Sequence, residues 1–472
     1  MKQSLISLLL FYSCISFMSS AIAQTETSKQ PNILMILVDD LGWRDLSSYG
    51  SDFYQTPNID QLANSGIKFS QAYSAAHICS PTRMSILTGQ HPARLHVTDW
   101  IPGWQYPNEK YSVPAWNLDG IKAKDLTVGE VLQDNGYKTA WFGKWHIKGL
   151  KEFVDRPLTK QDSEKNIAAQ YHGFDAGHQD FSLNGVHNKQ DPKGVHQLTN
   201  EAIDYISQIS KQNKPWFVTI SHYSVHTKVH FNDDIKALYD ERKKWVKSNQ
   251  NNSQYAAMLH SLDDSVATVM NYLTDNNLAE DTLVILLSDN GGLDKNDTGR
   301  PTDNAPLRNG KATLYEGGIR IPFIASWPGQ IKPNQTSDTL ISTVDLLPTF
   351  AQISGAKTPT STLDGVDISH LFFEPSATLH RNALYWHYPH YHRQGQPSGA
   401  IRDGDFKLIE FFNDQKIEVY NLKNDIGEQH NIAHLQPELT ASLLSKLRQW
   451  RLEVGAQTMP LNKNYDPNKA SW

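Results

Sequence analysis

The chain has 472 residues, of which 39% are hydrophobic, 20% are charged and 10% are aromatic. These values are typical of an ordered globular protein with about two or three domains, and they exclude an intrinsically disordered chain. The formal net charge of -6 argues against a protein that binds nucleic acid or a membrane surface through its overall charge.

The first 23 residues have the pattern of a secretory signal peptide. Lys2 supplies a positive charge, residues 5–17 form an apolar core, and the Ala-Ile-Ala sequence of residues 21–23 offers small side chains before a cleavage point. Serines interrupt the apolar core, which is short for a membrane span, and no later stretch is apolar enough to cross a bilayer. We therefore expect a mature protein that is exported to the periplasm or secreted, without membrane insertion.

Apolar runs of strand length alternate with helical stretches up to about residue 354. The runs lie at residues 33–38, 216–221 and 282–288, and we expect helices at residues 59–65, 127–135, 197–211 and 255–275. Continuous apolar runs fit strands that are covered on both faces. The alternation predicts a doubly wound α/β sheet, in a domain of residues 24–354.

The pattern changes in the last part of the chain, residues 355–472. Short strands are expected at residues 383–387, 399–402, 406–412 and 417–421, separated by turn signals such as Asp403-Gly404, and a helix is expected at 437–454. This pattern predicts a smaller C-terminal α+β subdomain with an antiparallel sheet.

Oxygen-bearing side chains directly follow two of the predicted strands. Asp39 and Asp40 follow the first run, and Asp289 and Asn290 follow the run at 282–288. Doubly wound sheets place ligand sites at such strand ends, and oxygen ligands suit Ca²⁺ or Mg²⁺. A single Asp after a strand is often a helix N-cap. Clustered carboxylates repel one another without a cation, however, so the two pairs together predict a divalent-cation site.

Cys79 is the only cysteine outside the predicted signal peptide, because the other one is Cys14. A single thiol in an exported protein has no partner for an intramolecular disulfide, although a buried structural cysteine is a common alternative. The run from Cys79 to Gly89, Cys-Ser-Pro-Thr-Arg-Met-Ser-Ile-Leu-Thr-Gly, resembles the signature of type I sulfatases.

Further segments resemble the same family. Residues 136–146 match its second signature, in which Lys144 and His146 would face the same side of an extended backbone. Asn309-Gly310-Lys311, followed by residues 315–322, is a third block. His226 matches the position of the family's leaving-group histidine, with His222 and His230 as neighbouring competitors and without the proline that usually lies nearby.

The resemblance to formylglycine-dependent sulfatases covers residues 39–322 and implies an alkaline-phosphatase-like fold, a doubly wound mixed sheet flanked by helices. It implies that a formylglycine-generating maturation enzyme converts Cys79 to formylglycine. It also implies one bound ion, Ca²⁺ or Mg²⁺, with these ligands: Asp39, Asp40, the modified Cys79, Asp289 and Asn290.

The resemblance further implies hydrolysis of a sulfate monoester by hydrated formylglycine. Arg83 and Lys144 would orient this nucleophile, and Lys311 would neutralise the sulfate oxygens. His226 would protonate the leaving oxygen, and His146 would take a proton from the second hydroxyl so that sulfate is expelled.

The sequence most resembles enzymes that remove sulfate from polysaccharides, such as algal galactans, ulvan or glycosaminoglycans. Residues 386–393 and the tryptophans after the first signature offer candidate sugar contacts, namely His387, His390, Arg393 and Trp100. The alternative is that these side chains pack between domains. Two other functions remain open: a phosphomonoesterase or phosphodiesterase on the same fold, and a non-catalytic protein that binds sulfated glycans with Cys79 unmodified.

Overall fold

The computed structural model describes residues 29–156, 159–178, 189–294, 301–381 and 383–470. The predicted signal peptide, with Cys14, lies outside the described residues. Within the described ranges, every helix is too short or too polar to cross a lipid bilayer.

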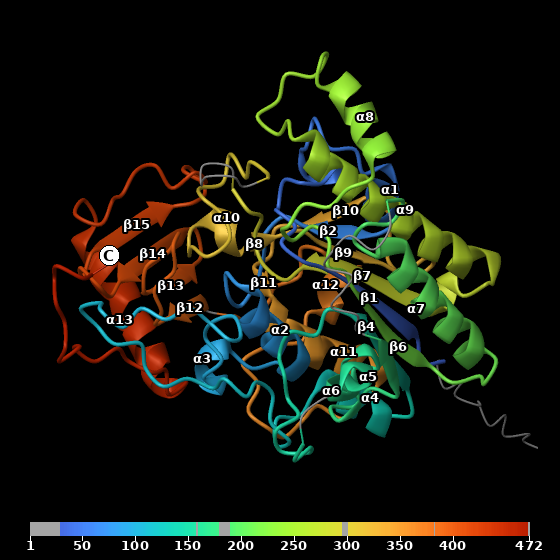
Figure 1. Ribbon diagram of the computed structural model, residues 1–472, viewed down its shortest axis with the longest axis horizontal. Coiled ribbons are helices and arrows are strands. Elements are labelled where there is room, and N and C mark those ends of the chain that lie inside the picture. Colours follow the sequence, from blue (N-terminus) through green and yellow to red (C-terminus); the bar gives the residue numbers. More distant parts are fainter. Residues whose placement is uncertain (1–28, 157–158, 179–188, 295–300, 382, 471–472) are drawn as a thin grey trace, which may run out of the picture.

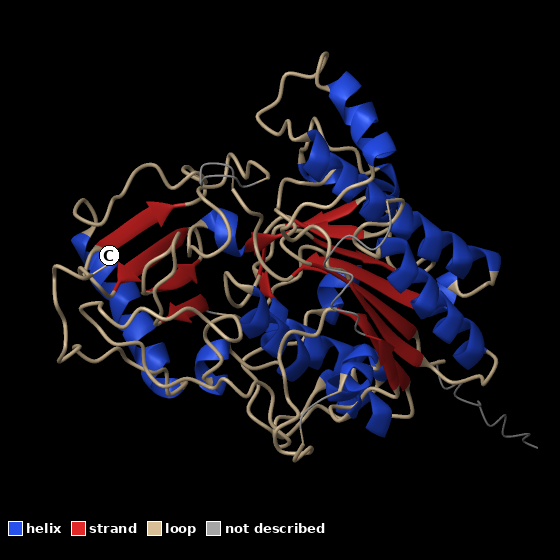
Figure 2. Ribbon diagram, viewed as in Figure 1, coloured by secondary structure: helices blue, strands red, loops and turns tan. Residues whose placement is uncertain are grey.

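A mixed sheet of eight strands forms the centre of the larger part of the molecule, with helices on both faces (Figures 1 and 2). Its strand order is β10-β2-β9-β7-β1-β6-β4-β5. Four neighbours at its centre run parallel: β7 (Thr282–Ser288), β1 (Asn32–Val38), β6 (Trp216–Ser221) and β4 (Lys138–Gly143). The edge on one side is β5 (Ala176–His178), also parallel.

The other side of the sheet contains the antiparallel pairings. Strand β9 (Phe323–Ser326) runs antiparallel to both β7 and β2 (Ile67–Phe69), and β10 (Gln335–Ser337) pairs in parallel with β2. A small second sheet is formed by β11 (Ile341–Ser342), β3 (Ala72–Tyr73) and β8 (Arg320–Ile321). The predicted α/β class with a mixed, helix-flanked sheet is confirmed.

Alternate residues of the central strands enter two different cores. Ile33 and Met35 of β1 face one core, which α2 (Cys79–Thr88), α4 (Val128–Asp134) and α11 (Leu346–Ser354) complete. Leu34 and Ile36 face the other, which α1 (Pro57–Asn64), α7 (Val195–Ser210) and α9 (Ser253–Asp275) complete. Because side chains of a strand alternate between its faces, both faces need apolar residues, and the run becomes continuous.

A four-stranded antiparallel sheet forms the C-terminal part. It contains β12 (Leu384–Tyr388), β13 (Ser398–Asp403), β14 (Phe406–Phe411) and β15 (Ile417–Asn421), as the turn signals predict. Helix α13 (Pro437–Glu453) packs against one face through Leu443 and Leu447. The other face packs on Leu314 and Ile319 of the larger part.

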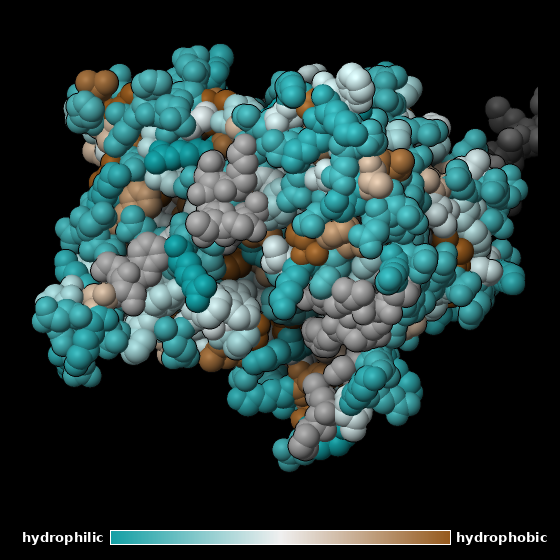
Figure 3. Space-filling view, turned by 45° about the horizontal axis from the view of Figure 1, so that its top comes forward, coloured by the Kyte–Doolittle hydropathy of each residue, from teal (hydrophilic) through white to brown (hydrophobic). Residues whose placement is uncertain are grey.

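The division between residues 354 and 355 stays a prediction. Helix α12 (Ser369–Phe373) lies beyond it, yet its Leu371 and Phe372 pack into the core of α2, α4 and α11. The remaining helices are short or peripheral: α3 (Pro92–Leu95), α5 (Lys160–Glu164), α6 (Ile167–Gln170), α8 (Asp233–Arg242) and α10 (Glu316–Ile319). Hydrophilic side chains cover most of the face shown in Figure 3.

Candidate active site

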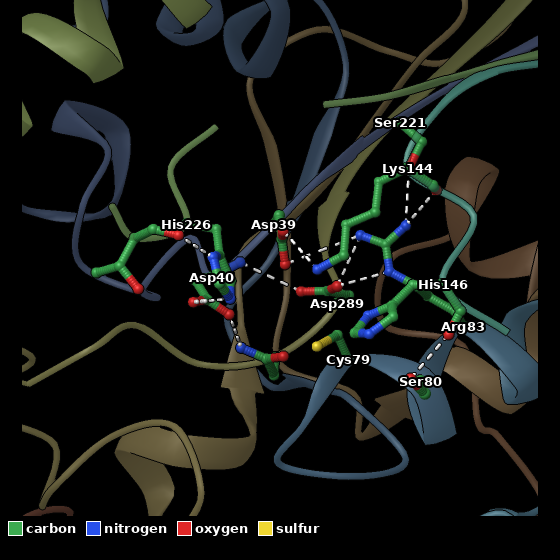
Figure 4. Close-up of polar contacts among 12 residues, drawn as sticks. Asp39, Asp40, Cys79, Ser80, Arg83, Lys144, His146, Ser221, His226 and Asp289 are labelled. Carbon is green, nitrogen blue, oxygen red and sulfur yellow. Dashed lines mark hydrogen bonds and ion pairs between the residues drawn. The ribbon is translucent and has the colours of Figure 1, made fainter. Parts of the chain in front are cut away.

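The two acidic pairs predicted from the sequence lie side by side. Strands β1 and β7 are hydrogen-bonded neighbours, with Val38 opposite Ser288, so the residues that follow both strands meet at one edge of the sheet. The backbone N–H of Asp40 donates to Asp289 Oδ1 at 3.2 Å. Figure 4 shows these carboxylates close to Cys79 and Arg83 of the first signature and to Lys144 and His146 of the second.

Cys79 begins helix α2, next to this cluster. The helix continues through Pro81, which is tolerated in a first turn, and ends at Thr88. Gly89 caps it with a left-handed φ of 63°, and its N–H donates to Ser85 O. Cys79 Sγ and carboxylate oxygens of Asp39 and Asp289 all lie within 4.8 Å of one another. Burial raises the pKa of the Cys79 thiol. This sulfur marks the place that the hydrated aldehyde of a formylglycine would take.

Arg83 lies one turn further along α2, on the same face as Cys79. Its guanidinium is fully buried, and Nε and Nη2 lie 2.9 and 2.8 Å from Asp289 Oδ2. Nη1 donates to the backbone oxygen of Lys144 at 2.7 Å and to Ser221 Oγ at 2.8 Å. The guanidinium therefore connects α2 with the ends of β4, β6 and β7.

Two lysines pair with the carboxylates that follow β1. Lys144 Nζ lies 2.6 Å from Asp39 Oδ2, and Lys311 Nζ lies 2.5 Å from Asp40 Oδ1 and 3.9 Å from Cys79 Sγ. Burial alone would raise the pKa of Asp39, but the charges of Lys144, His226 and Arg83 hold it well below its usual value. Burial and the charge of Asp39 raise the pKa of Asp289 to about 6.

Three oxygens of this cluster fit a divalent cation. Asp39 Oδ1, Asp40 Oδ2 and Asn290 Oδ1 are buried and have no hydrogen-bond partner in the part of the chain that the structure describes. Buried polar atoms are rarely left unpaired, because the lost hydration costs about 1–3 kcal/mol per group. All-oxygen donors of this kind suit Ca²⁺ or Mg²⁺, so the residues present fit the predicted ion.

Two histidines border the cluster. Figure 4 shows the His146 ring beside Cys79; its Nε2 faces Ile101 O at 3.2 Å, and its buried Nδ1 has no hydrogen-bond partner among the described residues. Burial and the charge of Lys144 lower the pKa of His146 well below its usual value. His226 Nε2 lies 3.7 Å from Asp40 Oδ2, and burial lowers its pKa to about 4. The structure thus brings His226 to the cluster.

The structure corrects part of the predicted sugar site. His387 is 7% exposed, and its Nε2 faces Gln457 O at 2.8 Å. His390 is 1% exposed, with Nε2 2.7 Å from Thr98 Oγ1. Both rings are buried, which leaves them little surface for a sugar. His390 packs against Thr98 of the larger part, as the packing alternative states, whereas the hydrogen-bond partner of His387 lies within the C-terminal part. Trp100 is half-buried, and Arg393 is exposed.

Several residues around the cluster were not singled out in the sequence. Ser221 accepts a hydrogen bond from Arg83 and donates one to Lys144 O at 2.7 Å. Ser80 Oγ donates to His146 O at 2.8 Å. Lys193 Nζ donates to His226 O at 2.8 Å. Two of these residues could have been found from the sequence, because Ser221 ends a buried strand and Ser80 follows Cys79. Nothing in the sequence marks Lys193.

Fold and site together define an enzyme of the alkaline-phosphatase superfamily. The chain belongs to the sulfatase family, whose model, described as Sulfatase, matches residues 31–356; the C-terminal model of N-sulphoglucosamine sulphohydrolase matches residues 309–453. The protein is therefore a type I sulfatase, a sulfuric ester hydrolase.

Individual proteins agree with this assignment. A sulfatase of Formosa agariphila is 32% identical, with 95% of this chain and 93% of that protein covered. Human arylsulfatase A is 29% identical, with 93% and 90% covered. The crystal structure of Ps i-CgsB in complex with k-i-k-neocarrahexaose superposes with a TM-score of 0.73 at 24% identity, over 93% of this chain and 96% of that one, which shows the shared fold.

Proposed function

We propose that the protein hydrolyses sulfate monoesters of a sulfated carbohydrate, with a formylglycine made from Cys79 as the nucleophile and one Ca²⁺ or Mg²⁺ ion as cofactor. The observation that carries the proposal is the position of Cys79 Sγ. It lies within 4.8 Å of carboxylate oxygens of Asp39 and Asp289, and 3.9 Å from Lys311 Nζ. Lys311, and a cation held by the two carboxylates, would stabilise an anionic nucleophile there.

The carbohydrate part of the proposal rests on likeness. The Ps i-CgsB structure holds k-i-k-neocarrahexaose, and its likeness to this protein extends over 93% of this chain. A sulfated polysaccharide or an oligosaccharide derived from one is therefore the substrate class that we propose. Algal galactans, ulvan and glycosaminoglycans all fall within it.

A formylglycine at position 79 and a divalent cation would complete the site. A formylglycine at position 79 would supply one hydroxyl for attack on sulfur and a second hydroxyl for the later release of sulfate. A cation held by Asp39, Asp40, Asp289 and Asn290 would supply positive charge for the sulfate oxygens.

The side chains already present would orient the reactants. Arg83 and Lys144 lie beside position 79. Arg83 is held in place by its ion pair with Asp289, and Lys144 by its ion pair with Asp39. Lys311, between Asp40 and Cys79, can contact a bound sulfate and reduce the repulsion between it and the nucleophile. Preorganised donors of this kind typically contribute about 2.7–4 kcal/mol each to transition-state stabilisation.

The two histidines would move protons. His226 would donate a proton to the leaving oxygen of the sugar as the sulfur–oxygen bond breaks. Burial lowers its pKa to about 4, so this role requires that the bound sulfate anion favours the protonated imidazole. His146 would accept a proton from position 79 in the second half of the reaction. Burial and neighbouring cations favour the neutral imidazole of His146, the form that can accept it.

Maturation and location belong to the same proposal. We propose that residues 1–23 direct export to the periplasm or beyond the cell, and that a maturation enzyme oxidises Cys79 before the protein acts.

The decisive experiment combines chemistry and activity. Protein purified from a host that forms formylglycine is digested, and the peptide that contains Cys79 is examined by mass spectrometry for the aldehyde. Sulfate release is then measured on defined sulfated mono- and oligosaccharides, beside phosphate release from matched phosphate esters. An aldehyde together with a preference for sulfate supports the proposal. Faster phosphate release would favour the phosphoesterase, and an unmodified thiol in a protein that binds glycans without turnover would favour the binding protein.

A further inference from the structure

Two loops that are distant in sequence meet beside the site. The first contains Trp100 and Trp104, and the second is the turn 392–395 between β12 and β13, which carries Arg393. The guanidinium carbon of Arg393 lies 5.3 Å from the centre of the Trp104 ring. Trp104 is 45% exposed and Arg393 is also exposed, so the stacked pair is open to solvent.

The turn that carries Arg393 is held against the segment of Lys311. His392 and Gly395 exchange backbone hydrogen bonds of 3.0 and 3.2 Å, which closes the turn. A Cβ atom on Gly395 would lie only 1.9 Å from Ala312 O, so the backbone of the turn rests directly on the residue after Lys311. This close contact fixes the position of the turn, and therefore of the Arg393 backbone, relative to Lys311.

The tryptophan loop is held against His146 in a similar way. Ile101 O lies 3.2 Å from His146 Nε2, and Ile101 N–H donates to Ser80 Oγ at 3.1 Å. The Trp100 ring lies 6.5 Å from the His146 ring and 5.6 Å from the Trp104 ring, centre to centre. The rings therefore form a continuous path from His146, beside Cys79, outward to Arg393.

The chemistry of the pair is specific. The exposed face of a tryptophan suits the apolar face of a sugar ring. Arg393 lies over the Trp104 ring and is exposed, and no carboxylate in the described ranges is ion-paired with it, so its N–H groups are available to a ligand. A guanidinium fork matches the two oxygens of a carboxylate or sulfate, with charge-assisted hydrogen bonds.

We infer that Trp104 and Arg393 form a sugar subsite that selects a second anionic group, a sulfate or a carboxylate, on the glycan beside the sulfate ester that is cleaved. This inference rests on the proposed function and narrows its substrate to polyanionic glycans. Trp104 supplies the stacking surface, and Arg393 supplies the charge selection.

The test compares four substrates. The first is a small aryl sulfate. The second, called the neutral sugar below, is a disaccharide whose only charge is the sulfate ester to be cleaved. The other two, the anionic sugars, are the same disaccharide with a second sulfate and a monosulfated disaccharide that contains a uronic acid. The variants are Arg393→Gln, Arg393→Lys and Trp104→Ala, with Lys423→Gln as a control at an exposed lysine in the turn after β15. kcat and KM are measured for each combination.

The expected pattern separates the two residues. Arg393→Gln lowers kcat/KM about tenfold or more on the two anionic sugars, because a charge-assisted contact is lost, and leaves the aryl sulfate and the neutral sugar unchanged. Arg393→Lys restores part of the loss. Trp104→Ala lowers kcat/KM on all three sugars but not on the aryl sulfate. A loss confined to the disulfated sugar identifies the second group as a sulfate, and one confined to the uronic acid identifies a carboxylate.

Other outcomes would overturn the subsite. These are wild-type rates that do not distinguish anionic from neutral sugars, or equal losses by Arg393→Gln on all four substrates. In both of them sulfate is still released from sugars, so the proposed function survives. Activity confined to the aryl sulfate would overturn the subsite and also the carbohydrate part of the proposed function. Wild-type protein that carries the aldehyde but releases no sulfate from any substrate would instead contradict the proposed function itself.

Discussion

Arg83 donates to groups at the ends of three strands of the central sheet: the side chain of Asp289, the backbone of Lys144 and the hydroxyl of Ser221. A guanidinium suits this role because its planar fork bonds several acceptors in fixed directions, which a lysine cannot do. Cys79, one turn earlier on the same helix, is thereby fixed relative to all three strands. The position of residue 79, the proposed nucleophile, thus depends on one buried side chain and its acceptors.

Replacing Cys79 by Ala should abolish sulfate release and leave the fold intact. The change removes the group from which the aldehyde forms, but the side chain is small and lies at the start of a helix whose other contacts remain. Activity, circular dichroism and a melting curve measure both effects. Met84→Leu, a volume-conserving change on the same helix, is the control and should keep its activity. Substantial activity in folded Cys79→Ala protein would contradict a mechanism through residue 79.

Removal of the divalent cation should lower stability and activity together. The proposed ion would bind the folded carboxylate cluster and not the unfolded chain, so at a hundredfold excess over Kd it would stabilise the fold by about 2.7 kcal/mol. A chelator should therefore lower the Tm of the wild-type protein. In Asp40→Asn the Tm should no longer respond, whereas the exposed-site control Glu438→Gln should respond like wild type. Full activity in a thoroughly chelated sample would exclude an essential ion.

At the scale of elements, β14 is joined to the segment of Lys311 by a buried charge cluster. Lys407 of β14 is 0% exposed, and its Nζ lies 3.0 Å from Glu316 Oε1 and 2.9 Å from Glu428 Oε1. Glu316 begins α10, and Glu428 Oε2 accepts its backbone N–H at 2.8 Å. The C-terminal sheet thus holds the start of α10, five residues after Lys311, through ionic contacts.

Replacing Lys407 by Met should destabilise the protein by about 3–5 kcal/mol, because buried Glu428 then loses its cation and Glu316 keeps only the longer contact of 3.5 Å with Arg320. Thermal or urea unfolding measures the loss, and Lys423→Met at an exposed site is the control. The triple variant with Glu316→Gln and Glu428→Gln should recover much of the stability, since the uncompensated charge is then removed as well. Equal instability of the single and triple variants would show that shape, and not charge, determines this contact.

At the scale of the whole molecule, buried histidines couple stability to pH. Burial lowers the pKa of His222, His387 and His390 to about 3, well below the usual value of 6.5. Below pH 6.5 the unfolded chain therefore binds protons that the folded chain does not bind. Each such histidine makes the free energy of unfolding fall by up to about 1.4 kcal/mol per pH unit as the pH drops from 6.5 towards 3.

The melting temperature should accordingly fall between pH 7 and pH 5. His387→Gln, whose amide can still donate to Gln457 O, should make this fall less steep by removing one titrating group. The comparison needs melting curves of wild type and variant over the same pH series. An unchanged slope in a folded His387→Gln variant would show that this histidine is not held neutral.

The sequence alone determined the strands at the centre of the sheet, because a strand covered on both faces must be apolar at every position, as in residues 33–38 and 282–288. It also placed the carboxylates at the ends of those strands and located Cys79, Lys144 and Lys311 by motif. These signals are local: each is contained in a few consecutive residues.

Only the tertiary structure decided which side chains meet. The antiparallel entry of β9, the burial of His387 and His390, and the stacking of Arg393 on Trp104 all depend on contacts between residues far apart in the chain. Two segments with the same content of aromatic residues and histidines can differ in role, because one can cover a core while the other faces a substrate. The role of such a segment is therefore set by the surfaces that the rest of the chain brings against it, and no local pattern records them.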